Sequence, residues 1–326
     1  MPKKILFLVI IFSAVVIAIA SVSIVKTRLS NEAPKEVELT NVKVGYLNLL
    51  SSALPLYLAQ DEKYFEKRGV KAEGVELASA NLAVEALTRG DIVAAPFISV
   101  FPYLSAEIVD PGKIKLFALS DFTEDNRFDA LLIRPDSPIK SLQDLSGKKI
   151  AVFPGSTATA FIKTYLQTNK VDISKNEFVQ LPPQSHLQAL QSKSVDAAYS
   201  FEPTFTLATE EGGMKILDES IYAKLFNHTP IAAGMINTKF ASENPVLAKK
   251  IIDAFNESYS SMRKKDGLAR TVSQKYFKLT DKVTQNVGMA YMTGADSDLF
   301  NKFVDFVVSI GELKQKPDLS SIFYKP

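Results

Sequence analysis

The sequence contains no cysteine and only two histidines among its 326 residues. Without cysteine the chain has no disulfide framework, no thiol nucleophile, no thiolate metal site and no lipid attachment through a cysteine. His186 and His228 are too few for a His-rich metal site, and no carboxylates cluster beside them in the sequence. These absences predict a protein that uses neither a metal nor another cofactor.

The net charge is small, at +2. Lys3, Lys4, Lys26 and Arg28 all lie in the first thirty residues, which hold no acid, so the rest of the chain is slightly acidic. The remaining basic residues are scattered among acids and form no stripe. This distribution argues against nucleic acid as a partner.

An apolar, uncharged segment, Ile5–Val25, follows the basic residues at the start of the chain. Ala18-Ile19-Ala20 has the form of a signal-peptidase site, whereas Ser21–Val25 prolongs the run to a length that spans a bilayer. Residues 1–30 are therefore predicted to be a signal peptide or a membrane anchor, and residues 31–41 a polar tether. Both alternatives place the remainder of the chain outside the cytoplasm.

Short apolar runs alternate with helical patterns from Val42 onward, and the alternation occurs twice. The runs predict these strands: Val42–Leu47, Val70–Leu77, Ile92–Ala95 and Ile114–Leu119 in the first copy, and Lys149–Phe153, Glu177–Leu181, Val195–Tyr199 and Lys215–Leu217 in the second. Helices are predicted between them, including Asn81–Arg89, Phe97–Ala106 and Ser156–Thr168. Such alternation predicts two α/β lobes, each with a parallel sheet covered on both faces.

Two further apolar runs, Asp129–Arg134 and Ile231–Asn237, are predicted to be strands that cross between the lobes. The boundaries then follow: residues 42–131 and 232–326 form lobe one, and residues 132–231 form lobe two. The C-terminal third is predicted to be helical and to pack on lobe one.

The stretch Lys148–Leu166, KKIAVFPGSTATAFIKTYL, combines a strand, a Pro-Gly-Ser-Thr turn and a helix with one apolar face. This arrangement directs free backbone N–H groups and the positive end of the helix dipole at one point. It favours binding of an anion or a polar ligand head, although an ordinary strand-to-helix turn has the same pattern.

Several stretches resemble the solute-binding proteins of ABC importers in the nitrate, sulfonate/taurine and thiamine-precursor group. The matching segments are GYLNLLSSALPLYLAQDEKYFEKRGV (Gly45–Val70), GDIVAAPF (Gly90–Phe97), SLQDLSGKKIAVFPGSTATAF (Ser141–Phe161), VDAAYSFEP (Val195–Pro203) and INTKFASENP (Ile236–Pro245). The resemblance implies the two-lobed periplasmic binding protein type II fold, with a ligand clamped between lobes that close about two hinge strands.

The resemblance also implies a set of ligand-binding residues in loops at the carboxyl ends of strands. They are Leu50, Ser51, Ser52, Pro96 and Phe97 from lobe one, and Gly155, Ser156, Thr157, Phe201 and Glu202 from lobe two. Two helix N-termini, at Ser52 and Ser156, would face each other and favour a sulfonate, carboxylate or nitrate group. Phe97, Phe201 and Phe153 would supply an apolar wall.

Glu202 has two open interpretations. Facing the ligand, it would favour an amine, an aminopyrimidine or a zwitterion over a bare anion; otherwise it is a solvated acid at the start of a helix. Arg127 is similarly either an anion contact or a surface residue. His228 is a candidate to line the cleft, and His186 is predicted to be exposed in the first turn of a helix.

The predicted function is extracytoplasmic solute binding for an ABC importer, with no catalysis. The solute would be a small anion or zwitterion (sulfonate or taurine, nitrate, or a pyrimidine precursor). The partners would be the permease and its ATPase, and the protein a monomer. The alternatives are an enzyme of the same fold in pyrimidine or menaquinone precursor synthesis, and the extracytoplasmic part of a sensor.

Overall fold

The computed structural model describes residues 39–264, 267–288 and 291–325. The predicted signal or anchor segment and the tether before Leu39 lie outside these residues. The chain from Thr40 to Pro326 forms one compact unit. Within its described part, no helix has the length and apolar character needed to cross a membrane.

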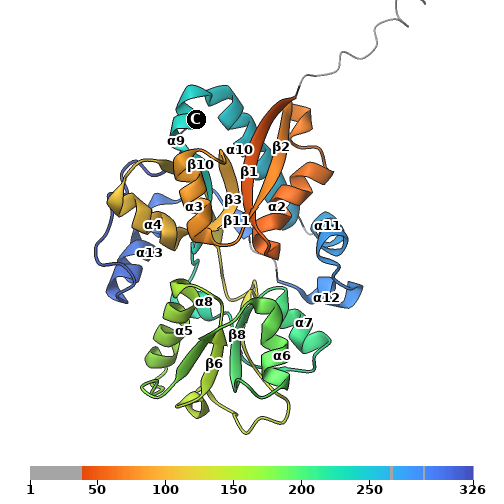
Figure 1. Ribbon diagram of the computed structural model, residues 1–326, viewed down its shortest axis with the longest axis vertical. Coiled ribbons are helices and arrows are strands. Elements are labelled where there is room, and N and C mark those ends of the chain that lie inside the picture. The colour runs from red at the N-terminus through yellow and green to blue at the C-terminus, as the bar shows by residue number, and fades with distance from the viewer. Residues whose placement is uncertain (1–38, 265–266, 289–290, 326) are drawn as a thin grey trace, which may run out of the picture. The chain divides into compact units, whose positions relative to one another are not determined.

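Two sheets with flanking helices make up this unit (Figure 1). The strands are β1 (Thr40–Leu47), β2 (Val70–Leu77), β3 (Ala94–Ser99), β4 (Ile114–Asp121), β5 (Asp129–Ile133), β6 (Lys149–Val152), β7 (Glu177–Gln180), β8 (Ala197–Phe201), β9 (Lys215–Glu219), β10 (Ala232–Asn237) and β11 (Tyr291–Thr293).

The helices cover both faces of the sheets, as the alternating pattern predicts. They are α2 (Leu50–Asp61), α3 (Ala80–Arg89), α4 (Val100–Val109), α5 (Ser156–Thr168), α6 (His186–Gln191), α7 (Thr204–Glu210), α8 (Ile221–Leu225), α9 (Thr238–Glu243), α10 (Pro245–Arg263), α11 (Leu268–Phe277), α12 (Asp281–Asn286) and α13 (Ser297–Ser309). Short 3₁₀ turns lie at Glu66–Arg68, Leu142–Leu145 and Pro183–Ser185.

The internal repeat is confirmed by the order of the strands. The first sheet runs β11-β4-β10-β3-β1-β2, and the second runs β7-β6-β8-β5-β9. Leaving out β11, the two orders match strand for strand, with β1 equivalent to β6, β3 to β8 and β10 to β5. We call the elements around the first sheet lobe one and those around the second sheet lobe two.

The predicted parallel pairing is confirmed for β1 with β2 and β3 and for β6 with β7 and β8, but neither sheet is parallel throughout. β10 pairs antiparallel with β3 and β4, and β5 pairs antiparallel with β8 and β9. Both β5 and β10 follow directly after the chain has passed from the other lobe, so each enters its sheet from the opposite end. Mixed sheets of this kind are common.

β5 and β10 are sheet strands along their whole length, and the segments that precede them make the crossings between the lobes. These two segments touch at an antiparallel bridge between Phe122 and Thr229, where each backbone N–H donates to the other residue's carbonyl. The predicted lobe boundaries at residues 131 and 231 therefore lie beside the crossings. The two segments that cross between the lobes are not strands of a sheet, as expected of hinge strands, but pair with each other at the single Phe122–Thr229 bridge.

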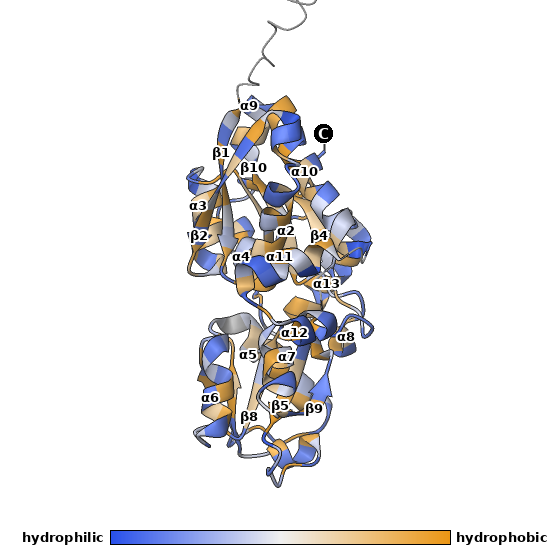
Figure 2. Ribbon diagram, turned by 90° about the vertical axis from the view of Figure 1, so that its right-hand side faces the viewer, coloured by the Kyte–Doolittle hydropathy of each residue, from blue (hydrophilic) through white to orange (hydrophobic). Residues whose placement is uncertain are grey.

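Apolar residues concentrate on the strands and on the helix faces that cover them, whereas hydrophilic residues lie outside (Figure 2). One core cluster extends from lobe one through the crossing segments to lobe two, through Phe101, Phe122, Phe161 and Phe303. The C-terminal third is helical as predicted except for β11, which pairs with β4 at the edge of the first sheet.

Candidate functional site

Most of the predicted site residues lie on three strand–helix junctions, and Pro96 and Phe97 lie within β3. Leu50, Ser51 and Ser52 open α2 after β1, whereas Gly155, Ser156 and Thr157 lie at the start of α5 after β6. Phe201 ends β8, and Glu202 follows it. These three groups occupy the carboxyl ends of parallel strands, where ligands bind in open α/β sheets.

The prediction that Pro96 and Phe97 form a loop was wrong, because β3 continues through them to Ser99. Backbone pairing with β10 extends the strand, with Ala232 opposite Ser99 and Ala233 opposite Ile98. The register shifts between Ala233 and Met235, opposite Pro96. A proline has no N–H for the ladder, so an irregularity is where a strand accommodates it.

Ser52 joins two strands at this junction. Its hydroxyl accepts a hydrogen bond from the N–H of Leu47, over 3.0 Å, and donates one to the carbonyl of Phe97, over 2.8 Å. The residue is fully buried. Its hydroxyl is therefore committed to holding the ends of β1 and β3 together.

Both α2 and α5 begin without a side-chain cap from the residue at the N-cap position. These residues are Leu49 and Gly155, which have no hydrogen-bonding side chain. The backbone N–H groups of Leu50, Ser51 and Thr157 meet no acceptor within the described part of the chain. The two equivalent helices thus each present unpaired donors and a positive dipole end.

Gln180, at the end of β7, lies against the start of α5 and was not predicted. Its side-chain oxygen Oε1 accepts the N–H of Gly155 over 3.1 Å, and the residue is exposed. The backbone of Gly155 has a φ of 110°, a value that favours glycine. The register of β6 with β7, in which Val152 pairs with Gln180, brings the two residues together. The pattern of residues in the sequence does not show which residues of β6 and β7 pair, so the contact of Gln180 with Gly155 was not foreseen.

A series of aromatic contacts connects Phe97 of lobe one with Phe201 of lobe two. Phe97 packs edge-on against Phe122 of the crossing segment, and Phe122 lies 4.5 Å from Phe128, measured between ring centroids. Phe128 then contacts Phe201, which contacts Phe153. Phe97, Phe153 and Phe201 are partly exposed, as an apolar wall requires.

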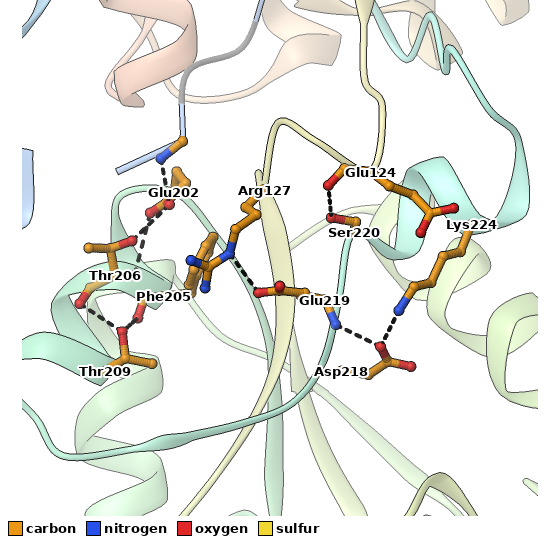
Figure 3. A network of polar contacts seen from close by, with 11 residues as sticks. Glu124, Arg127, Glu202, Phe205, Thr206, Thr209, Asp218, Glu219, Ser220 and Lys224 are labelled. Atoms are coloured by element: carbon orange, nitrogen blue, oxygen red, sulfur yellow. Dashed lines mark hydrogen bonds and ion pairs between the residues drawn. The ribbon is translucent and has the colours of Figure 1, made fainter. Parts of the chain in front are cut away.

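Glu202 is buried, with 3 % of its surface exposed, so the interpretation of a solvated acid was wrong. Its Oε1 accepts hydrogen bonds from the Thr206 hydroxyl and from the N–H of Gly288, each over 2.8 Å (Figure 3). Burial raises the pKa of the Glu202 carboxyl to about 8, against the lowering effect of these bonds. That Glu202 faces the ligand and favours an amine or a zwitterion stays a prediction.

Arg127 lies in the first crossing segment and is half-exposed. Its Nε forms an ion pair with Glu219 over 2.8 Å, and its guanidinium lies over the ring of Phe205 (Figure 3). This pairing supports the interpretation of a surface residue and satisfies part of its charge.

The two histidines have different surroundings. The prediction that His186 is exposed was wrong: its ring is buried, with Nε2 donating to the carbonyl of Leu181 and Nδ1 accepting from Ser200. Burial lowers the pKa of the His186 imidazole and so favours its neutral form. His228 is exposed, and its Nδ1 lies 2.8 Å from Asp121.

Asp129, at the start of β5, is a second buried carboxyl that sequence reasoning missed. It accepts the Tyr199 hydroxyl over 2.7 Å and the N–H of Tyr222 over 3.2 Å. Burial raises the pKa of its carboxyl to about 7. Two buried acids therefore lie at the ends of neighbouring strands of lobe two, with Asp129 at the start of β5 and Glu202 just after β8.

Known proteins with this architecture include solute-binding proteins. The chain is 28% identical, over 77% of its length and 74% of the relative's, to a Bacillus subtilis protein named "Putative aliphatic sulfonates-binding protein". The fold matches the periplasmic aliphatic sulphonate binding protein SsuA of Escherichia coli, with a TM-score of 0.72 and 19% identity over 88% of this chain and 92% of that one. It also matches the periplasmic nitrate-binding protein NrtA of Synechocystis PCC 6803, with a TM-score of 0.65 and 17% identity over 87% and 84%.

An enzyme has the same fold. The desulfurization enzyme DSZB matches with a TM-score of 0.66 and 13% identity, over 87% of this chain and 96% of the enzyme. The architecture alone therefore does not separate binding from catalysis. The expected fold, the periplasmic binding protein type II fold, is confirmed by these matches. Residues 51–266 match the model of the family described as NMT1/THI5 like, and the chain belongs to that family.

Proposed function

We propose that this protein is the extracytoplasmic solute-binding component of an ABC importer, and that it holds a small anion such as a sulfonate between its two lobes. One observation carries the proposal: α2 and α5, which occupy equivalent positions in the two sheets, both start with unpaired backbone donors. Donors of this kind, at the positive end of a helix dipole, bind sulfonate, carboxylate and nitrate groups.

The ligand-binding residues in this proposal are those predicted from the sequence. The structure suggests which of them would act through the backbone, through an aromatic ring or indirectly. Leu50, Ser51 and Thr157 would act through their backbone N–H groups, and Phe97 and Phe201 through their partly exposed rings. Ser52 would act indirectly, by fixing the end of β1 at which α2 begins. The relatives named for sulfonate binding support the same ligand class.

Binding without catalysis is favoured by the surroundings of the histidines. His186 is buried and bonded to Ser200 and to Leu181, whereas His228 pairs with Asp121. Within the described part of the chain, neither ring bonds to an exposed nucleophile, which a hydrolytic triad needs. We therefore assign the protein to solute capture in the importer, as a monomer that delivers its ligand to the permease and its ATPase.

Isothermal titration of the full chain with alkanesulfonates, taurine, nitrate and an aminopyrimidine tests this proposal. Saturable binding of a sulfonate or nitrate at one site per chain is expected, with the ligand recovered unchanged after incubation. Binding of the aminopyrimidine, with no binding of any of the anions, would contradict the proposed anion site. Conversion of the ligand, detected by NMR, would overturn the assignment as a binding protein.

A further inference from the structure

The lobes touch at α12 as well as at the two crossing segments and at the aromatic contacts of α5 with α4 and α13. α12 belongs to the C-terminal part of lobe one, where it follows α11, which packs on α2. It also lies beside α7 of lobe two in both views (Figures 1 and 2). Leu207 of α7 packs against the apolar cluster that contains Leu54 of α2 and Val283 of α12.

The polar contacts between α7 and α12 are mostly at the surface. Lys282 pairs with Glu210 over 3.0 Å, the Thr280 hydroxyl donates to Glu211, and Asn286 donates to Glu210. The Lys282 side chain is 62% exposed, so solvent screens this ion pair and it adds little.

The contact between Glu202 and Gly288 differs because it is buried. Gly288, just after α12, donates its N–H to Oε1 of Glu202. The N–H of Glu202 itself donates to the carbonyl of Phe128 in the first crossing segment, over 3.0 Å. Three parts of the chain therefore meet at Glu202: the crossing segment at its backbone N–H, and Thr206 of α7 and Gly288 at its carboxyl (Figure 3).

Gly288 is also packed too closely for any other residue. A Cβ atom at this position would lie 1.7 Å from the carbonyl oxygen of Arg127, which is far inside van der Waals contact. The backbone at Gly288 therefore lies directly on the crossing segment. Glycine at this position is what allows the N–H to reach Glu202.

We propose that Glu202 is a positioning residue: by accepting the N–H of Gly288, it fastens the segment after α12 to lobe two and limits how far the lobes separate. A hydrogen bond acts over a short range and in one direction, so it breaks when the lobes part. The aromatic contacts on the other side of the crossing, such as Phe161 with Phe303, are less directional and suit a pivot. The inference goes beyond solute binding, and its readout needs no ligand.

The test is single-molecule energy transfer between dyes on the two lobes of the full chain. Because the sequence has no cysteine, Asn81→Cys in lobe one and Gln191→Cys in lobe two provide the sole attachment sites, and both residues are exposed. Glu202→Met removes the oxygen that accepts the Gly288 N–H and keeps a side chain of similar length. Gly288→Ala adds a Cβ that forces this residue away from the Arg127 carbonyl. Each should raise the population of open molecules on the order of tenfold, the equivalent of losing one buried hydrogen bond.

Two matched variants distinguish the bond of Glu202 to Gly288 from its bond to Thr206 of α7. Glu202→Gln keeps an oxygen acceptor, and Thr206→Val removes the other donor to Oε1 while leaving Gly288 in place. Both should retain the distance distribution of the parent. An unchanged distribution in folded Glu202→Met and Gly288→Ala would overturn the proposal, and so would equal opening by Thr206→Val. Failure of every tested solute to bind the parent protein would overturn the proposed function without affecting this result.

Discussion

The backbone N–H of Gly155 donates a hydrogen bond to Oε1 of Gln180, at the start of the helix that we assign to anion binding. A neutral amide oxygen thus lies beside the place that the anion would occupy. A full negative charge there would compete with the ligand for the same donors and the same dipole.

Gln180→Glu should therefore weaken sulfonate binding by about tenfold at low ionic strength, with the loss diminishing as salt screens the charge. Titration calorimetry at two salt concentrations measures both effects. Gln167→Glu, at the exposed far end of α5, is the control for added charge and should leave the affinity nearly unchanged. Equal affinity for Gln180→Glu and the parent would exclude α5 from the site.

Gly155→Ala should weaken binding through the backbone alone. No atom lies within 4 Å of a Cβ added to Gly155, but its φ of 110° is strained for any side chain, at about 1–3 kcal/mol. Relief of the strain would turn the N–H groups at the start of α5 away from the ligand. Gly213→Ala, which has equally open space and a φ of 67° in the same lobe, should lower stability without lowering affinity. The hypothesis fails if both variants bind the solute as the parent does.

Ser52→Ala should destabilise the protein by about 1–3 kcal/mol, because it leaves the N–H of Leu47 and the carbonyl of Phe97 without their buried partner. Urea denaturation measures the change. Ser51→Ala is the matched control, since the Ser51 side chain is also buried but makes no hydrogen bond within the described residues, and it should cost much less. Similar losses for the two variants would contradict the role given to Ser52.

Stability should fall as the pH rises through the range in which Asp129 and Glu202 titrate. Burial raises the pKa of these carboxyls to about 7 and about 8, so the folded protein takes up protons that the unfolded chain releases. Their contribution is complete below about pH 4, where the unfolded chain is protonated as well. It falls as the pH rises, by up to about 1.4 kcal/mol per pH unit for each group, and is lost near pH 7 for Asp129 and near pH 8 for Glu202. The cations Lys224 and Arg127 oppose the shifts only in part.

Glu202→Gln should flatten this decline between about pH 5 and pH 8, because the amide does not titrate. Urea denaturation at a series of pH values gives the slope. Glu243→Gln, which changes an exposed glutamate of α9, should keep the slope of the parent. Parallel curves for Glu202→Gln and the parent would show that Glu202 ionises normally.

The order of strands and helices was predictable from the sequence because it depends on local periodicity. α5 begins at Ser156 and ends at Thr168 as predicted, and β2 spans Val70–Leu77 as predicted. The direction of β5 and β10 was not predictable, because it depends on which sheet each strand enters after the crossing. β3 was predicted too short for the same reason, since its second half is stabilised by β10, more than 130 positions away.

The candidate site was predictable in part. The starts of α2 and α5 were found because a turn, a hydroxyl residue and an apolar helical face are adjacent in the sequence. The burial of Glu202 was not, since Gly288 is 86 positions distant. The burial of His186 similarly depends on Ser200, which reaches it from the neighbouring strand β8. Gln180 reaches Gly155 only through the pairing of β6 with β7.

The placement of β10 has a consequence for how the chain folds. All five strands of the second sheet come from one continuous stretch, Asp129 to Glu219, whereas the first sheet lacks a strand between β3 and β4 until residues 232–237 arrive. Pairing across so long a loop is slow, because the entropy of closing the loop opposes it. The lobe whose residues are synthesised first is therefore the last to be completed, and a chain interrupted between the lobes would leave β4 without a partner strand and one edge of β3 unpaired.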